Sequence, residues 1–357
     1  MEEAKLDSNV VEAESQVEEV IEIDQEELEK EKVQEYYERN HWRITFKRML
    51  RDWRLYVMLI PLALVFIFWR YLPMYGLLIA FKNFQNDGII SADFIGFAGF
   101  AKLWVDPLFW RAFRNTFMLS FYGLLFGFPF PIILALLFSE VKNQVYRTIL
   151  QVLSYLPKFV SLVVVTTLIT LLCAKSSDTY SGGVITQLFM NIGWLPQGGN
   201  LLGDNGAYFR AIYQVSGIWE AAGYGSIVYF AAILSISPTS YEAARMDGAN
   251  KWAQIRYVTF PGIASTLTIM LILEMGKMFT VGYEKVYLLY NDNMFETADI
   301  VSTYVMRNTG MTDGATSTSA IKYAMSSAAD LFNALIAMLL VIGSNMVARQ
   351  VSDTSLY

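Results

Sequence analysis

Long apolar segments alternate with polar connections along most of this 357-residue chain. Six of the segments are long enough to cross the roughly 30 Å hydrocarbon core of a bilayer as helices. They lie at residues 56–79, 115–138, 149–173, 211–236, 263–283 and 328–348. The pattern therefore predicts an all-α, polytopic membrane protein whose six transmembrane helices occupy residues 55–350.

The chain before the first apolar segment is polar and has two parts. Residues 1–38 hold 15 acidic and 3 basic side chains, a composition that is well solvated and buries little surface. We predict a flexible cytoplasmic tail there, with a docking segment for a partner as the alternative. Residues 39–54 are basic, and Trp42 and Phe46 belong to an apolar stripe at helical spacing. This favours an amphipathic helix in the membrane interface over a solvated basic linker.

The distribution of lysine and arginine predicts the orientation in the membrane. If the N-terminus lies inside, the inner regions carry 12 basic residues in roughly 60 positions, and the long outer loops carry nine in roughly 115. Arg111 and Arg114 lie near the predicted outer end of the second span and weaken this bias. We therefore expect a cytoplasmic N-terminus, a cytoplasmic loop at 237–262 and a cytoplasmic C-terminal tail at 351–357.

The composition excludes several classes of site. The chain is 54% hydrophobic and 17% charged, and it has one cysteine, Cys173, and one histidine, His41. An intrachain disulfide is therefore impossible, and the single histidine, beside the first apolar segment, argues against a Ser-His-Asp triad and a histidine-rich metal site. We expect neither a metal site nor a nucleic-acid partner.

The inner loop at 237–262 has strong local signals. Ser237 is a favourable helix N-cap, and Pro238 suits the first helical position. Gly248 is able to adopt the left-handed conformation that ends a helix, and Asn250 to cap a second one. Pro261 marks the return to the membrane. The loop is predicted to fold as helix, glycine turn and helix, exposed on the inner face.

This loop resembles the signature of ABC importer permeases, which reads Glu-Ala-Ala, three residues, Gly, nine residues, Ile, one residue, Leu-Pro. Val258 stands in place of the isoleucine and Phe260 in place of the leucine. The resemblance implies a type I ABC importer permease fold whose loop inserts into a separate ATPase subunit; an ordinary helix-turn-helix connection is the alternative. The residues assigned to ATPase coupling are Glu242, Ala243, Ala244, Arg245, Asp247, Gly248 and Pro261.

The chain contains no G-x-x-x-x-G-K-[ST] phosphate loop. We therefore expect a transport subunit without catalytic residues or a cofactor of its own. ATP and Mg²⁺ would be bound by a dimer of the partner ATPase.

Other segments resemble the carbohydrate, maltose-type branch of these permeases, and within it the LplB-like subgroup. They are Tyr155-Leu156-Pro157, the stretch 282–289 and the end Ser355-Leu356-Tyr357. Lys158 replaces a histidine that is usual in the subgroup. The resemblance implies import of an oligosaccharide across a bacterial cell membrane. It also implies a heterodimer with a second, similar permease and a lipid-anchored solute-binding protein.

Polar and aromatic residues in or beside the apolar segments are candidates for the sugar path, because sugars need aromatic platforms and hydrogen-bonding groups. The candidates are Trp219, Glu220, Tyr224, Tyr283, Glu284 and Asn333. Interfacial anchoring and helix packing are the alternative roles. Glu274 and Lys277 are three residues apart, so we expect them to pair on one helix face.

Three other functions are compatible with parts of the sequence. An ABC permease for a non-sugar solute would keep the same loop. An ion-gradient-driven secondary transporter would also have six spans and intramembrane charges, but it would not need the 237–262 loop. A membrane enzyme would need a catalytic constellation, and we recognise none in the sequence.

Overall fold

The computed structural model describes residues 41–43, 45–46, 49–84, 88–175, 182–196, 198–203, 206–311 and 319–351. The predicted tails at 1–38 and, apart from its first residue, 351–357 lie outside these residues. The described chain is helical and forms no strand; one isolated antiparallel bridge joins Lys82 and Phe94. The predicted all-α class is therefore confirmed.

The chain divides into two units, Met1–Tyr75 and Gly76–Tyr357. In the first, residues 41–43, 45–46 and 49–51 are helical and lead into α2 (Trp53–Phe66). A π turn, η1 (Ile67–Tyr71), and a 3₁₀ segment, η2 (Leu72–Phe81), extend this helix into the second unit. Placement of the 39–54 stretch in a membrane interface remains a prediction.

Four continuous helices are long and apolar enough to cross a membrane, and two bent pairs raise the number to six in the described chain. The continuous ones are Trp53–Phe81, Pro107–Glu140, Phe209–Leu234 (α9) and Ala320–Arg349, the last within α17 (Ala320–Val351). Pro107–Glu140 comprises α4 (Pro107–Tyr122), the π turn η3 (Gly123–Gly127) and α5 (Pro129–Glu140). Each predicted span thus has a counterpart in the structure.

The third span is bent rather than straight. It consists of α6 (Gln144–Tyr155), a 3₁₀ turn, η4 (Leu156–Phe159), and α7 (Leu162–Leu172), with 94° between the two arms. Pro157 has no backbone N–H and so cannot continue the α-helical hydrogen-bond ladder. The sequence predicted the apolar length correctly but not this break.

The fifth span is bent by 67° and lies earlier in the chain than the predicted 263–283. Its first arm comprises α11 (Lys251–Gln254), the π turn η6 (Ile255–Thr259) and α12 (Phe260–Gly262), and its second arm is α13 (Ala264–Gly276). The N–H of Lys277 bonds to the carbonyl of Glu274, three residues back, which tightens the last turn. Because α13 ends at Gly276, Tyr283 and Glu284 lie beyond the span rather than at its end.

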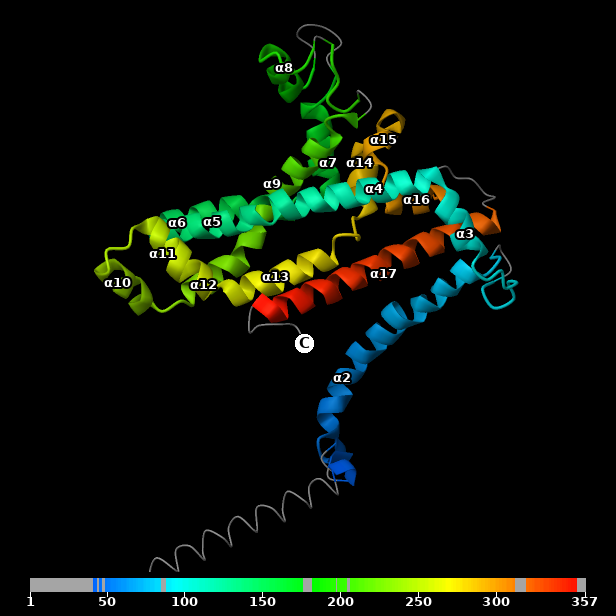
Figure 1. Cartoon of the computed structure of the whole chain (residues 1–357), viewed down its shortest axis with the longest axis horizontal. Coiled ribbons are helices and arrows are strands. Elements are labelled where there is room, and N and C mark those ends of the chain that lie inside the picture. Colours follow the sequence, from blue (N-terminus) through cyan, green and yellow to red (C-terminus); the bar gives the residue numbers. More distant parts are fainter. Residues whose placement is uncertain are drawn as a thin grey trace, which may run out of the picture. The chain divides into compact units, whose positions relative to one another are not determined.

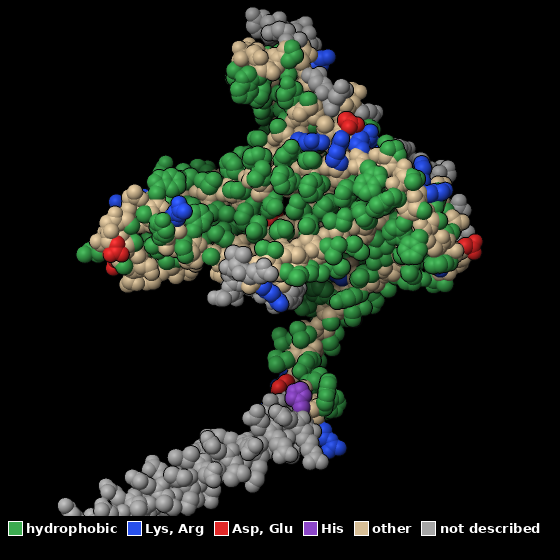
Figure 2. Space-filling view, in the orientation of Figure 1, with side chains coloured by type: hydrophobic (Ala, Val, Ile, Leu, Met, Phe, Trp, Pro, Cys, Tyr) green, Lys and Arg blue, Asp and Glu red, His purple; other side chains and the backbone are tan. Residues whose placement is uncertain are grey.

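Within the second unit, α5 packs against α9 and α13 packs against α17 (Figure 1). Buried Ala135 lies in the α5–α9 core with Ile132, Tyr229 and Ile233. Small residues at such contacts let helix backbones approach closely, which drives packing in lipid. Side chains on the visible face of α4, α5, α13 and α17 are mostly hydrophobic, as lipid contact requires (Figure 2).

Short helices flank the spans. The connection between the third and fourth spans contains α8 (Val184–Asn191). The loops predicted to face outward also contain α3 (Ala98–Val105), α14 (Tyr283–Leu289), α15 (Phe295–Ala298) and α16 (Val301–Asn308). The loop at 237–262 contains α10 (Pro238–Met246) and α11, which lie together at one end of the second unit (Figure 1). Short helices thus lie in the connections at both ends of the apolar spans.

Candidate coupling loop and transport path

The loop between α9 and α13 folds as its sequence predicts. α10 begins at Pro238, and Gly248 adopts a left-handed φ of 80° where the chain turns. Asn250 caps α11 by accepting a hydrogen bond from the N–H of Ala253 at 2.9 Å. One detail of the prediction is wrong: Ser237 is at the N-cap position, but its hydroxyl lies 2.7 Å from that of Thr239 and makes no capping bond.

Two side-chain contacts brace this loop against the spans. The hydroxyls of Tyr241 and Thr259 are 3.0 Å apart and join α10 to η6. The ammonium of Lys251 lies 2.6 Å from a carboxylate oxygen of Glu140 at the end of α5. The projecting part of the loop, residues 238–252, which we call the α10 knob, is therefore joined to η6 at Thr259 and to α5 at Glu140.

The knob presents a mixed polar and apolar surface. Glu242, Ala243 and Arg245 are exposed, as are Asp247, Gly248 and Pro261, whereas Ala244 is half-buried. Met246 and Trp252 are 87% and 80% exposed. Aromatic residues, methionine and arginine are enriched where proteins bind one another, so the surface suits a protein partner.

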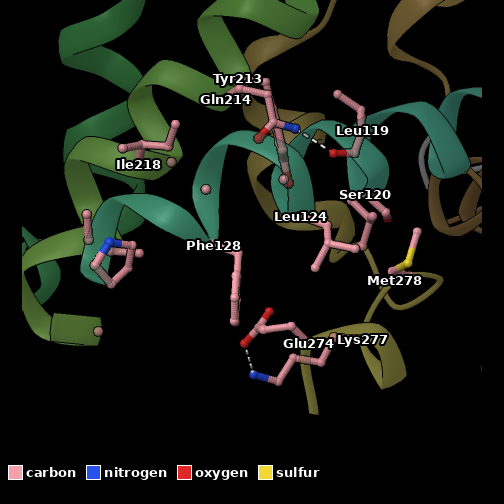
Figure 3. A pocket seen from close by; sticks show the side chains of 18 of the residues that line it. Leu119, Ser120, Leu124, Phe128, Tyr213, Gln214, Ile218, Glu274, Lys277 and Met278 are labelled. Atoms are coloured by element: carbon pink, nitrogen blue, oxygen red, sulfur yellow. Dashed lines mark hydrogen bonds and ion pairs between the residues drawn. The ribbon is translucent and has the colours of Figure 1, made fainter. Parts of the chain in front are cut away.

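A hollow of about 440 Å³ lies among α4, η3, α5, α9 and α13 (Figure 3). Gly123, Gly127 and Gly217 line it and leave it open. At one edge Lys277 donates a 2.7 Å hydrogen bond to Glu274, which confirms the pair predicted from their spacing. The hollow therefore combines an apolar wall with one ion pair.

A second set of charges, which we call the charge cluster, comprises Lys158, Glu220 and Lys285. Glu220 on α9 lies 3.2 Å from the ammonium of Lys158 and 3.6 Å from that of Lys285. Lys158 is in η4 at the break of the third span, and Lys285 is in α14. One carboxylate thus joins three elements that are distant in sequence.

The six predicted path residues do not converge on one site. Trp219, Glu220 and Tyr224 share α9, whereas Tyr283 and Glu284 begin α14. The amide of Asn333 on α17 donates to the carbonyl of Phe279 at 2.6 Å. None of the six lines the 440 Å³ hollow; Trp219 lines a separate apolar hollow of about 410 Å³ among α5, α6 and α9.

The partners of Glu220 were not predicted from the sequence. A signal was present, because lysines are rare in apolar segments and require a counter-charge. Lys158 follows Pro157 inside the third apolar segment, and Lys285 follows the fifth. Which carboxylate they share depends on the fold, because Lys158 is 62 residues from Glu220.

Comparison with known proteins decides the family. Residues 127–353 match the family described as binding-protein-dependent transport system inner membrane component. The chain belongs to this family of transport permeases.

Relatives and solved structures place the permease more closely. It is 37% identical to protein LplB of Bacillus subtilis over 86% of this chain and 92% of LplB. It is 34% identical to YteP of Bacillus subtilis, a polygalacturonan/rhamnogalacturonan transport system permease protein, over 87% of this chain and 92% of YteP. A chain of a bacterial ABC transporter involved in the import of the acidic polysaccharide alginate superposes with a TM-score of 0.74 at 38% identity, covering 86% of this chain and 99% of that one. The permease therefore has the type I ABC importer fold and is a multi-pass membrane transport subunit rather than an enzyme.

A buried carboxylate, Asp299, joins α16 to the α4 span. Asp299 is fully buried and accepts two hydrogen bonds from Arg307, at 3.1 and 2.8 Å, and one from Arg111 at 3.2 Å. Burial by itself would lower the pKa of Arg307, but the hydrogen bonds and the charge of Asp299 raise it above its ordinary value. This network joins α16 to α4.

Asn115 and Asp106 extend the same contact region of α4. Asn115 is fully buried, donates to the carbonyl of Asp299 and accepts from Arg210 of α9 at 2.8 Å. Asp106 caps α4 and accepts a 2.7 Å hydrogen bond from the hydroxyl of Tyr304. Burial, followed by the contact with Asp106, raises the pKa of Tyr304 well above its ordinary value.

In the part of the chain that the structure describes, no three His, Cys, Asp or Glu side chains are grouped to hold a metal.

Proposed function

We propose that the permease forms half of the membrane path of an ATP-driven importer, and that its cargo is an oligosaccharide delivered by an extracytoplasmic solute-binding protein. The braced and exposed α10 knob carries the first part of this proposal, because it offers a separate ATPase a rigid contact. The name of the relative YteP, a polygalacturonan/rhamnogalacturonan transport system permease protein, supports a carbohydrate cargo.

The knob would sit in a cleft of the ATPase, where ATP and Mg²⁺ are bound and hydrolysed. Glu242 is exposed on α10 and gives the contact a directional charge. Closure of the ATPase dimer would push α10, and the Tyr241–Thr259 and Lys251–Glu140 contacts would carry that motion into α13 and α5. A second, similar permease would complete the path as a heterodimer.

This arrangement requires the knob and both termini to be cytoplasmic. Impermeant maleimide labelling of Met246→Cys and Trp194→Cys in intact cells tests the orientation, since both positions are exposed and the native Cys173 is buried. We expect labelling at position 194 and protection at position 246. The reverse pattern contradicts the orientation.

Uptake by proteoliposomes tests the function. The permease is reconstituted with its partner permease, the ATPase and the binding protein, and uptake of a labelled oligosaccharide is followed. We expect uptake to require ATP and the loaded binding protein. Uptake by the permease alone, driven by a sodium or proton gradient, overturns the proposal; ATP-dependent uptake of amino acids or phosphate instead overturns only the carbohydrate cargo.

Two variants test the knob. Because a charged hydrogen bond contributes about 1.5–3 kcal/mol, Glu242→Ala is expected to lower coupled ATP hydrolysis by about tenfold or more. Gly248→Val strains a position with φ of 80° and is expected to act in the same direction. Asp93→Ala, at an exposed acidic residue, and Gly193→Val, at an exposed glycine with φ of 79°, are the matched controls. Equal activity of variants and controls contradicts the docking of the knob.

A further inference from the structure

The charge cluster has more positive than negative charge. Glu220 can neutralise one of the two lysines that flank it, at 3.2 Å from Lys158 and 3.6 Å from Lys285. Among the described residues no other carboxylate forms an ion pair with either lysine. The cluster therefore keeps a net positive charge next to the apolar interior of the spans, where charge is costly unless it serves a ligand or a contact.

The two lysines differ in their accessibility. The side chain of Lys285 is 10% exposed, and its ammonium lies 5.1 Å from the ring centroid of Tyr213. The side chain of Lys158 is 42% exposed. An ammonium has three donor hydrogens, and Glu220 is the one protein acceptor that Lys158 reaches in the described chain. Lys158 is therefore the lysine able to take an additional anionic ligand.

Exposed aromatic residues lie next to the charge cluster along the chain. Phe159, next to Lys158, is 74% exposed, and its ring lies edge-on to that of Tyr224 with 6.0 Å between centroids. Trp219, next to Glu220, is 51% exposed. Aromatic faces pack against the apolar C–H faces of sugars, while a cation suits a sugar carboxylate.

The cluster also borders the central hollow. Tyr213 and Gly217 line the hollow, and both lie beside the ammonium of Lys285. The same surface of α9 thus runs from the hollow to Glu220, which pairs with Lys158. A molecule that moves along the hollow would meet the cluster.

We infer that Lys158, positioned by Glu220 and flanked by Phe159, Trp219 and Tyr224, forms a subsite for a carboxylate-bearing sugar unit, so that the cargo is an acidic oligosaccharide. This inference rests on the proposed function. Glu220 has a second role here, because it repels the incoming carboxylate and keeps binding weak. A transport path needs such weak sites, since cargo must leave as readily as it enters.

Uptake of two cargoes by the reconstituted complex tests the subsite. The cargoes are a galacturonate trisaccharide and its carboxyl-reduced counterpart, used with a binding protein that calorimetry shows to capture both. Lys158→Gln is expected to reduce uptake of the acidic cargo about tenfold, the effect of losing one ionic contact, while uptake of the neutral cargo changes less than twofold. Lys158→Arg should restore acidic uptake, and Glu220→Gln should lower the KM for the acidic cargo. Lys102→Gln, at an exposed lysine of α3, is the control.

The possible outcomes separate the two proposals. Equal losses for both cargoes in Lys158→Gln would mean that the cluster merely pins the bend of the third span, and the inference would be wrong. ATP-dependent uptake of the neutral cargo alone by the unaltered complex would also overturn it, while leaving the proposed function intact. If neither cargo enters with ATP and the loaded binding protein present, the proposed function fails and the inference fails with it.

Discussion

The guanidinium of Arg307 bonds both carboxylate oxygens of Asp299, with its closest nitrogen at 2.8 Å and the carboxylate fully buried. Thr303 donates to the same carboxylate at 2.9 Å, and Arg111 approaches it from α4. The short helix α16 is therefore joined to the α4 span through one carboxylate.

Asp299→Asn should destabilise the permease markedly. The substitution keeps the size of the side chain but leaves the half-buried guanidinium of Arg307 without its counter-charge, and that of Arg111 with only Glu296 at 3.9 Å. Removing one partner of a buried ion pair costs about 3–5 kcal/mol. We expect a clearly lower thermal unfolding midpoint in detergent. Glu296→Gln is the control, since Glu296 pairs with Arg114 but its side chain is 60% exposed; a similar loss in both variants contradicts the special role of Asp299.

Tyr241→Phe should weaken coupling without unfolding the permease. It removes the hydroxyl that lies 3.0 Å from Thr259 and joins α10 to η6. A neutral hydrogen bond contributes about 0.5–1.5 kcal/mol, too little to unfold the chain. We expect more ATP hydrolysed per cargo molecule and an unchanged unfolding midpoint. Tyr257→Phe, at a residue 71% exposed in η6, should leave the ratio unchanged; no difference between the two variants would argue against transmission through Tyr241.

Gly223→Ala should disturb the packing of α9 on α6. A Cβ at this position would collide with the carbonyl oxygen of Ser154, which belongs to the backbone and cannot move aside. Overpacking of this kind costs about 1–3 kcal/mol. We expect a smaller yield of monodisperse protein and a lower unfolding midpoint. Gly343→Ala on α17, where a Cβ meets nothing within 4 Å, should be neutral or mildly stabilising; equal behaviour of both variants would contradict close packing at Gly223.

Local features of the sequence predicted much of the coupling loop. Pro238, Gly248 and Asn250 each act within a few residues of their own position, and the structure shows them at a helix start, a left-handed turn and a helix cap. The capping bond expected of Ser237 is absent, and its hydroxyl contacts that of Thr239 instead. The Glu274–Lys277 pair was predictable for the same reason, since the partners are one helical turn apart.

The transport path was less predictable. Trp219, Glu220 and Tyr224 were selected for polarity within an apolar segment, and that criterion does not specify a direction around the helix. The structure directs Glu220 toward Lys158 and Lys285, and Asn333 toward Phe279. The hollow itself is lined largely by glycine and apolar residues, which no composition rule distinguishes from ordinary packing.

The sequence by itself determined the all-α membrane class, the apolar spans and the exposed loop around Glu242, because segment length, helical periodicity and turn residues act locally. Only the tertiary structure decided the 94° bend beside Lys158, the pairing of that lysine with Glu220, and the burial of Asp299 against Arg111, 188 residues away. The physical reason is that an ion pair buried among helices depends on how the spans pack. The electrostatic requirement for a partner is visible in the sequence, but the identity of that partner is not.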